Sequence, residues 1–168
     1  IAFEICKYFN IPKIKYYNNK FNKNKKIKKI SIFPISTSVL RTMQIKVINE
    51  LLLFLKNKIE VEIFFDDKSE ISKFIEKKLD TKSFIKQNPK NIHSLIESIE
   101  QIDYGIFVDS GPLHVSKIMG KKGILVETSV SEKVLLNNYN KIKVVKNQFS
   151  SKYCNATCGL IDIFSYKN

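Results

Sequence analysis

Apolar residues along the chain follow two alternating patterns, one typical of β-strands and one typical of α-helices. Short runs rich in apolar residues, each the length of a buried strand, occupy residues 30–33, 61–65, 83–85, 106–108, 123–126 and 141–145. Most of the stretches between them carry apolar residues at steps of three and four, the spacing of one helix face. Strands that alternate with amphipathic helices predict a parallel sheet with helices on both faces, so the predicted fold class is α/β.

The helical spacing also places the helices. The first predicted helix runs from about Gln44 to Lys58, and the second follows the pair Asp66-Asp67. Asn91 suits the N-cap of a third helix, because its side chain accepts a hydrogen bond from the first turn. The apolar faces predicted for these helices are Ile45, Ile48, Leu52 and Leu55; Ile71, Phe74, Ile75 and Leu79; and Ile92, Leu95, Ile96, Ile99 and Ile102.

The stretch 106–120 has the pattern of a binding turn. A buried strand ends at Asp109-Ser110-Gly111-Pro112 and a helix follows. Pro112 fits the first helical position, where its missing N–H has no partner to lose, and Ser110 and Gly111 stand where a cap belongs. Such a turn aims N–H groups and the positive end of the helix dipole at one point. That arrangement favours an anion, above all a phosphate.

Charge narrows the classes of partner. The formal net charge is +13, from 29 Lys and Arg against 16 Asp and Glu. Arg41 is the one arginine, whereas proteins that read nucleic acid depend on arginine for bidentate contacts, so we expect no nucleic-acid partner. The lysine-rich charge predicts attraction to an acidic membrane surface instead. No apolar run reaches the roughly 20 residues that a membrane helix needs.

Cysteine usage bears on the compartment. Cys6, Cys154 and Cys158 are an odd number in a chain without a secretory signal pattern, which predicts reduced thiols and a cytoplasmic protein. The positive net charge further predicts that the protein contacts the inner face of the cytoplasmic membrane as a peripheral protein. Cys154 and Cys158 have no second ligand pair nearby, so we expect no metal site.

The residues of the binding turn resemble those of a known family. Asp109, Ser110, Gly111 and His114 match D-[ST]-G-x-x-H, the signature of the C-terminal half of the ADP-heptose:lipopolysaccharide heptosyltransferases. The resemblance implies a Rossmann-like domain, one of the two that make the GT-B fold. It also implies inverting transfer of heptose or a related sugar from an ADP-sugar to a lipopolysaccharide core acceptor. The family needs no cofactor and no obligatory metal.

The resemblance assigns roles to individual residues. The donor diphosphate would be held by Ser36, Thr37, Arg41, Ser110, Gly111 and His114. Asp109 would accept hydrogen bonds from the donor sugar, while Glu70 and Lys90 would contact the nucleoside, by position rather than by motif. A structural reading stands beside each role: a helix cap for Ser110 and Gly111, a turn hydrogen bond for Asp109, packing for His114 and a solvated side chain for Arg41.

The resemblance also suggests a domain organisation. Residues 1–29 are expected to be the end of a preceding domain and a Lys/Asn-rich linker, 30–149 a nucleotide-sugar-binding domain, and 150–168 an irregular tail. In the family, an N-terminal domain supplies the general base and the pocket for the lipid-linked saccharide acceptor. We therefore expect this chain to be the second half of such an enzyme, with little or no turnover by itself.

Three positions depart from the family pattern. Thr42-Met43 replaces a segment that contains Trp, and Lys117 stands where a small residue is usual. The stretch Glu127 to Glu132 replaces the family's Gly-Pro-Thr-Asp-Pro. This replacement is expected to place a negative charge near the diphosphate and to repel the donor.

Other readings of the sequence remain open. The departure at Glu127 favours a non-catalytic nucleotide-binding or interaction module derived from such an enzyme. A sugar-nucleotide 2-epimerase-like protein of GT-B shape is the other alternative, and it would prefer a UDP-sugar. No G-x-G-x-x-G or P-loop pattern follows any predicted strand, which argues against dinucleotide and P-loop chemistry. A phosphatase would need a second Asp where Gly111 stands.

Overall fold

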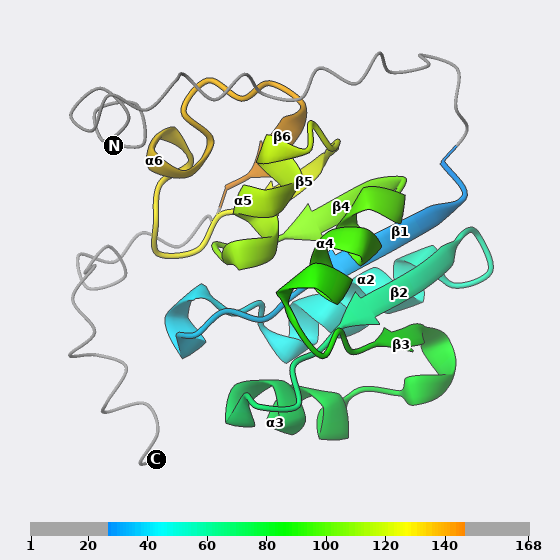
Figure 1. The fold of residues 1–168 in the computed structure, drawn as a ribbon. Coiled ribbons are helices and arrows are strands. Elements are labelled where there is room, and N and C mark those ends of the chain that lie inside the picture. The colour runs from blue at the N-terminus through cyan, green and yellow to red at the C-terminus, as the bar shows by residue number, and fades with distance from the viewer. Residues whose placement is uncertain (1–26, 147–168) are drawn as a thin grey trace.

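The computed structural model describes residues 27–146, and these form one parallel six-stranded sheet with helices on both faces (Figure 1). The strands lie in the order β3-β2-β1-β4-β5-β6. This confirms the predicted α/β class. The strands are β1 (Lys29–Phe33), β2 (Glu60–Phe64), β3 (Ile85–Gln87), β4 (Tyr104–Phe107), β5 (Gly123–Val126) and β6 (Ile142–Val145).

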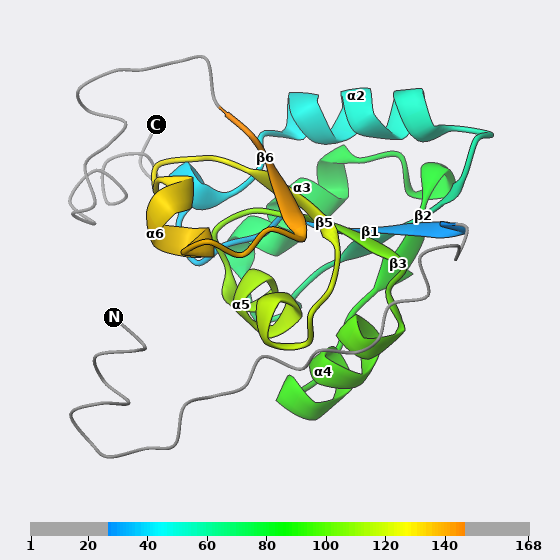
Figure 2. The ribbon, with the colours of Figure 1, turned by 90° about the horizontal axis from the view of Figure 1, so that it is seen from above.

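The helices divide between the two faces of the sheet. Seen from above, α2 and α3 lie on one side of the strands, and α4 and α5 lie on the other (Figure 2). The α-helices are α2 (Ile45–Leu55), α3 (Glu70–Lys78), α4 (Ile92–Gln101), α5 (Gly111–Ile118) and α6 (Glu132–Leu136), and two short 3-10 helices are η1 (Val39–Arg41) and η2 (Thr81–Ser83).

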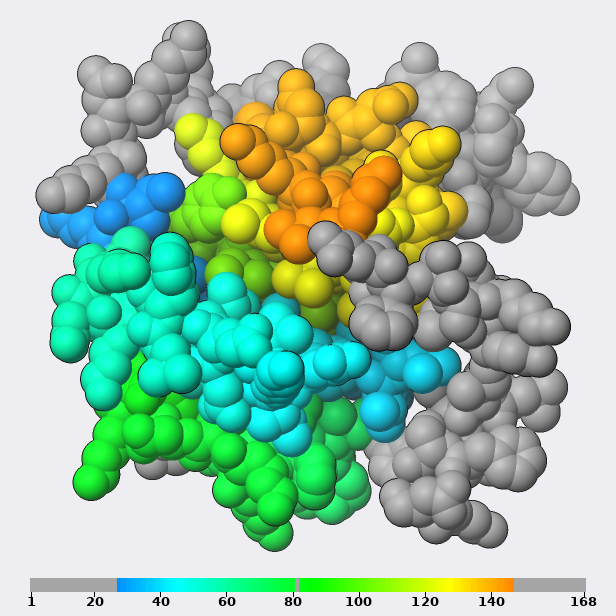
Figure 3. Space-filling model, turned by 180° about the vertical axis from the view of Figure 1, so that it is seen from behind, coloured from blue at the N-terminus to red at the C-terminus, as the bar shows by residue number. Residues whose placement is uncertain are grey.

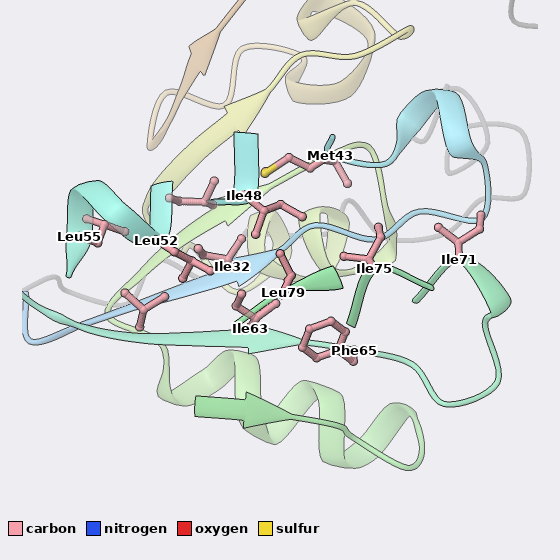
Figure 4. Close-up of a cluster of buried hydrophobic side chains, with 13 residues drawn as sticks. Ile32, Met43, Ile48, Leu52, Leu55, Ile63, Phe65, Ile71, Ile75 and Leu79 are labelled. Atoms are coloured by element: carbon pink, nitrogen blue, oxygen red, sulfur yellow. The ribbon is translucent and has the colours of Figure 1, made fainter. Parts of the chain in front are cut away.

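Two apolar cores fill the spaces between the layers. On the α2/α3 side, Ile32 and Ile63 are adjacent in the sheet register and pack with Ile48 of α2 and Ile75 of α3 (Figure 4). On the other side, Phe107 and Leu125 pack with Leu113 of α5. Strand residues alternate between these cores because successive side chains point to opposite faces. Each fully buried apolar side chain contributes about 1.5–3 kcal/mol.

A row of three aromatic rings crosses the centre of the sheet. Phe33 stacks on Phe64 with ring centroids 4.2 Å apart, and on Phe107 with centroids 5.1 Å apart. The ring of Phe107 lies over Gly105, since a Cβ built on Gly105 would come within 2.0 Å of it. A Cβ on Gly123, the register partner of Gly105, would come within 2.8 Å of the same ring. The glycines therefore leave the space that lets Phe107 lie flat on the sheet.

The structure places several elements differently from the sequence pattern. The third strand was predicted at 83–85 but is Ile85–Gln87, because the Asp80 carboxylate accepts hydrogen bonds from Lys82 N and Ser83 Oγ and holds a 3-10 turn there. The first helix ends at Leu55 instead of near Lys58, since Asn57 adopts a left-handed φ of 62°.

Helix α6 is absent from the sequence prediction. Its five residues are too few to show a helical period. Two end signals were present: Ser131 accepts a hydrogen bond from Lys133 N, and Asn137 ends the helix with φ 43°.

The predicted apolar faces of two helices were too wide. Phe74 of α3 is 57% exposed, and the Lys78 ammonium lies 5.9 Å from its ring centroid. Ile92 and Ile96 of α4 are exposed as well, whereas Ile99 of the same helix is buried. A spacing of three or four residues identifies a helix face, but the width of that face depends on what packs against it.

Seen from behind, helix α2 runs across the middle of the molecule, below β6 (Figure 3). Two large side chains of its outer surface, Leu53 and Phe54, are 72% and 66% exposed. The Lys58 ammonium lies 3.9 Å from the Phe54 ring centroid, within range of a cation–π contact.

Within residues 27–146, no helix has the length and apolar character to cross a membrane.

Candidate functional site

The strand order reverses direction between β1 and β4, and the crevice at their carboxyl ends is where sheets of this kind bind ligands. A cavity of about 620 Å³ lies there. It extends along the edge of the sheet from the loop after β4 to the loops after β2 and β3. Phe33 and Phe64 of the aromatic row form part of its lining.

The loop after β1 is built around the hydroxyl of Thr42. This hydroxyl accepts a hydrogen bond from Ser36 N at 3.0 Å and donates to Ser38 O at 2.8 Å. Ser36 is buried, and its own hydroxyl donates to the backbone oxygen of Asp109 at 2.8 Å. The loop is thereby closed on itself and fastened to the end of β4. Thr42, which stands in the segment where the family carries Trp, has a structural role here.

Arg41 brings a positive charge to the cavity. One terminal nitrogen, Nη1, lies 3.3 Å from Asp109 Oδ2, and the other, Nη2, donates to Thr37 Oγ1 at 2.8 Å. The Arg41 side chain is 33% exposed, so part of the guanidinium remains open to solvent. All three residues line the cavity.

The turn between β4 and α5 supplies the start of a helix. Ser110 is the N-cap, but its hydroxyl donates to Val108 O instead of capping the first turn. Gly111 is the first helical residue and Pro112 the second, one position later than predicted. A Cβ built on Gly111 meets nothing within 4 Å. The backbone there faces open space, and the positive end of the α5 dipole faces the same cavity as Arg41.

His114 lies one turn into α5 and completes this end of the cavity. Its Nε2 is 3.9 Å from Asp109 Oδ1. Burial and the positive charge of Lys117 lower the pKa of His114, an effect that Asp109 partly offsets. The imidazole is therefore neutral at pH 7 and can give a hydrogen bond to a phosphate oxygen, but it adds no full charge.

The far end of the cavity contains two carboxylates that sequence reasoning did not single out. Asp66 and Asp67 follow β2 directly and line the cavity together with Lys90. Lys90 Nζ lies 2.6 Å from Asp67 Oδ2, so this pair links the loop after β2 to the loop after β3. An acidic residue at the end of the second strand is the usual ribose ligand of sheets with this strand order. Applied to the sequence, that rule selects the stretch from Asp66 to Glu70, and the prediction named Glu70 within it.

Glu70 is the one predicted site residue that the structure does not place in the cavity lining. It begins α3, and its carboxylate lies 2.7 Å from Lys73 Nζ on the next turn of the same helix. The other predicted residues, Ser36, Thr37, Arg41, Lys90, Asp109, Ser110, Gly111 and His114, all line it. The structure brings them together from three loops, and it does not test the contact assigned to each.

Glu127, which was expected to place a negative charge near the diphosphate, lies outside the cavity lining. Glu127 Oε1 accepts a hydrogen bond from Glu132 N at 3.1 Å, so this carboxylate caps the start of α6. Lys117, another departure from the family pattern, donates from Nζ to the backbone oxygen of Leu135 in α6. Both unusual residues thus hold α6 in place.

Within residues 27–146, His, Cys, Asp and Glu do not form a cluster of three or more that could hold a metal ion. Cys6, Cys154 and Cys158, together with the predicted interdomain linker and tail, lie outside the described residues.

Comparison with known proteins extends the description of the fold. No protein-family model matches the sequence, and the search of curated proteins found no match either. Among solved structures, Escherichia coli ADP-heptose lipopolysaccharide heptosyltransferase II matches with a TM-score of 0.59 and 15% identity over 84% of this chain. A glycosyltransferase of family 9 from Veillonella parvula matches with a TM-score of 0.61 and 14% identity over 84% of this chain.

A third match is E. coli heptosyltransferase WaaC, in a structure with ADP-2-deoxy-2-fluoro heptose, with a TM-score of 0.60 and 11% identity over 73% of this chain. The chain shares its fold with these glycosyltransferases. It covers 41%, 40% and 38% of heptosyltransferase II, the Veillonella protein and WaaC, respectively. At these identities the likeness concerns the fold, and the activity has to be argued from the site.

Proposed function

We propose that this chain is the C-terminal, donor-binding domain of an inverting glycosyltransferase of lipopolysaccharide core synthesis. The observation that carries the proposal is the crevice between β1 and β4. There the one arginine of the chain and the open start of α5 at Gly111 face the same cavity. A guanidinium that faces the same cavity as the backbone N–H of Gly111 is suited to a diphosphate, because both favour negative charge.

The proposed donor is ADP-heptose or a close relative. The cavity has room for a nucleotide, and its far end combines apolar side chains, such as Phe65 and Leu95, with the carboxylates of Asp66 and Asp67. Apolar walls suit a base, and a carboxylate suits ribose hydroxyls. The structures of WaaC were determined with ADP and with an ADP-heptose analogue, which favours adenine over uracil.

In the proposed reaction the donor domain stabilises the leaving group. Negative charge grows on the diphosphate as the bond to the sugar breaks. Arg41, Thr37, His114 and the N–H of Gly111, which line the cavity, would stabilise that charge. The general base and the acceptor pocket would belong to another domain, so we expect the isolated chain to bind donor without turnover. Sustained sugar transfer by this chain to a lipid-linked saccharide would contradict this division of labour.

The test is calorimetric titration of the chain with ADP, UDP and ADP-heptose. We expect the adenine nucleotides to bind more tightly than UDP. Arg41→Ala should weaken ADP binding about tenfold or more, equivalent to about 1.4 kcal/mol. Arg41→Lys should retain part of the affinity, because it keeps the charge but loses the planar fork. Lys46→Ala is the matched control, since it removes a positive charge from an exposed position of α2 outside the cavity.

The alternatives predict other results in the same titration. If none of the three ligands binds, the chain is a non-catalytic module that has lost the donor site. A preference for UDP would instead point to a 2-epimerase-like protein. If Arg41→Ala and Lys46→Ala weaken ADP equally, the guanidinium has no specific contact with the diphosphate and the proposed site is wrong.

We further propose that the protein is cytoplasmic and touches the acidic inner face of the cytoplasmic membrane. This is supported by the net charge of +13 and by the exposed side chains Leu53 and Phe54 of α2 and Phe74 of α3, two of which lie beside lysines. Such a location would bring the enzyme to a lipid-linked acceptor.

A further inference from the structure

The carboxylate of Asp109 is enclosed by its neighbours. The residue is 6% exposed. Its Oδ2 lies 3.3 Å from Arg41 Nη1, and its Oδ1 lies 3.9 Å from His114 Nε2. Its backbone oxygen accepts the Ser36 hydroxyl at 2.8 Å, which fixes the main chain at the end of β4. Both carboxylate oxygens are therefore directed at side chains of the protein.

Arg41 is held at two points without any ligand. Asp109 binds one end of the guanidinium and Thr37 Oγ1 binds the other at 2.8 Å. A free arginine side chain has about 2 kcal/mol of rotamer entropy to lose when a ligand orders it. The two contacts occupy two of the five N–H donors of the guanidinium, and the remaining donors are left for a ligand.

We propose that Asp109 is a positioning residue: it fixes the guanidinium of Arg41 toward the cavity and makes no contact with the donor itself. This inference rests on the proposed function for its ligand, although the positioning can be measured without one. A carboxylate that touched the diphosphate would repel it. The same carboxylate, turned toward Arg41, instead orders the guanidinium in advance, so that the Arg41 side chain loses less conformational entropy when a diphosphate binds.

The first experiment uses the fact that Arg41 is the one arginine in the 168 residues. Its Nε–Hε group gives a single resonance in a ¹⁵N-labelled sample of the full chain, so it is identified without assignment. In the wild type we expect the ¹⁵N relaxation of this group to be that of the rigid backbone. In Asp109→Asn it should become that of a flexible side chain. Glu97→Gln, which neutralises an exposed carboxylate of α4 outside the cavity, should leave it unchanged.

The second experiment is a double-mutant cycle on ADP affinity. Asp109→Asn should weaken ADP about fivefold, equivalent to about 1 kcal/mol, although it removes a negative charge from the site. In the Arg41→Ala background the same substitution should change the affinity less than about twofold, because the side chain through which it acts is gone. Asp109→Asn should weaken the binding of ADP and of ADP-heptose by the same factor. Asp109→Ser provides a second variant at the same position: if Asp109→Asn fails to fold, the Arg41 side chain should become flexible in Asp109→Ser instead.

Three results would overturn the proposal. In the first, the Arg41 resonance stays rigid in Asp109→Asn, or in Asp109→Ser if Asp109→Asn fails to fold. In the second, Asp109→Asn binds ADP as tightly as the wild type or more tightly. In the third, only the binding of ADP-heptose is weakened, which would assign Asp109 to the sugar. A different result would contradict the proposed function but not this inference. In that case the wild type binds no ADP, yet its Arg41 side chain is rigid and becomes flexible in Asp109→Asn.

Discussion

At the scale of single residues, Gly111 can show whether the turn after β4 serves the fold or the binding of a ligand. A glycine is usually required where a side chain would clash or where φ is positive. Neither applies here, because the space around its Cβ position is empty and its φ is not among the positive values. The missing side chain instead leaves the backbone of the α5 start open to the cavity.

Gly111→Ala is therefore expected to keep the fold and to lose the ligand. The free energy of unfolding should change by no more than about 0.5 kcal/mol, since no neighbour is disturbed. ADP binding should weaken about tenfold or more, because the new methyl group occupies the space where a phosphate would meet the backbone. Urea unfolding and calorimetry on the same sample measure both quantities. Unchanged ADP affinity would show that Gly111 is only the first residue of a helix.

At the scale of elements, the sheet and α6 explain residues that look unusual in the sequence. Glu127 and Lys117 depart from the resembled family, and both turn out to support α6. One caps its first turn and the other binds the Leu135 carbonyl near its end. The donor-repelling charge expected from the sequence is thus turned away from the cavity.

The aromatic row gives a prediction for the sheet. Gly105→Ala would place a methyl group within 2.0 Å of the Phe107 ring, and the ring is held between the sheet and α5. Such overpacking costs about 1–3 kcal/mol, which urea unfolding would detect. Gly111→Ala is the matched control for a glycine-to-alanine change. Adding Phe107→Leu to Gly105→Ala should recover part of the loss. If Gly105→Ala is as stable as the wild type, the ring is free to move and the row is not rigid.

At the scale of the whole molecule, charge and exposed apolar side chains predict binding to anionic membranes. The full chain should sediment with vesicles that contain phosphatidylglycerol and remain in solution with vesicles of phosphatidylcholine alone. Raising the salt from about 0.1 M to about 1 M shortens the range of electrostatic attraction from about 10 Å to about 3 Å and should release the protein. Equal binding to both kinds of vesicle would mean that the positive charge does not direct the protein to acidic lipid.

The sequence by itself determined the fold class and most of the elements, but not the short helix α6. The alternation of strand-like runs and helical spacing predicted the α/β class. The Asp109-Ser110-Gly111 turn was identified from residue types, and Arg41 was singled out through the resemblance to the heptosyltransferases. These features are local, since a strand or an amphipathic helix is encoded by neighbours within a few positions of one another.

Only the tertiary structure decided how those elements meet. The pairing of β1 with β4 brings Arg41 to Asp109, 68 positions later in the chain, and Ser36 to the Asp109 backbone, 73 positions later. No periodicity encodes such contacts. The same holds for the Leu135 backbone oxygen that Lys117 reaches and for the exposure of Phe74. It holds as well for the lining of the cavity by Asp66 and Asp67 rather than by Glu70. The direction of a long polar side chain depends on partners from distant segments, and those partners are fixed only when the layers pack.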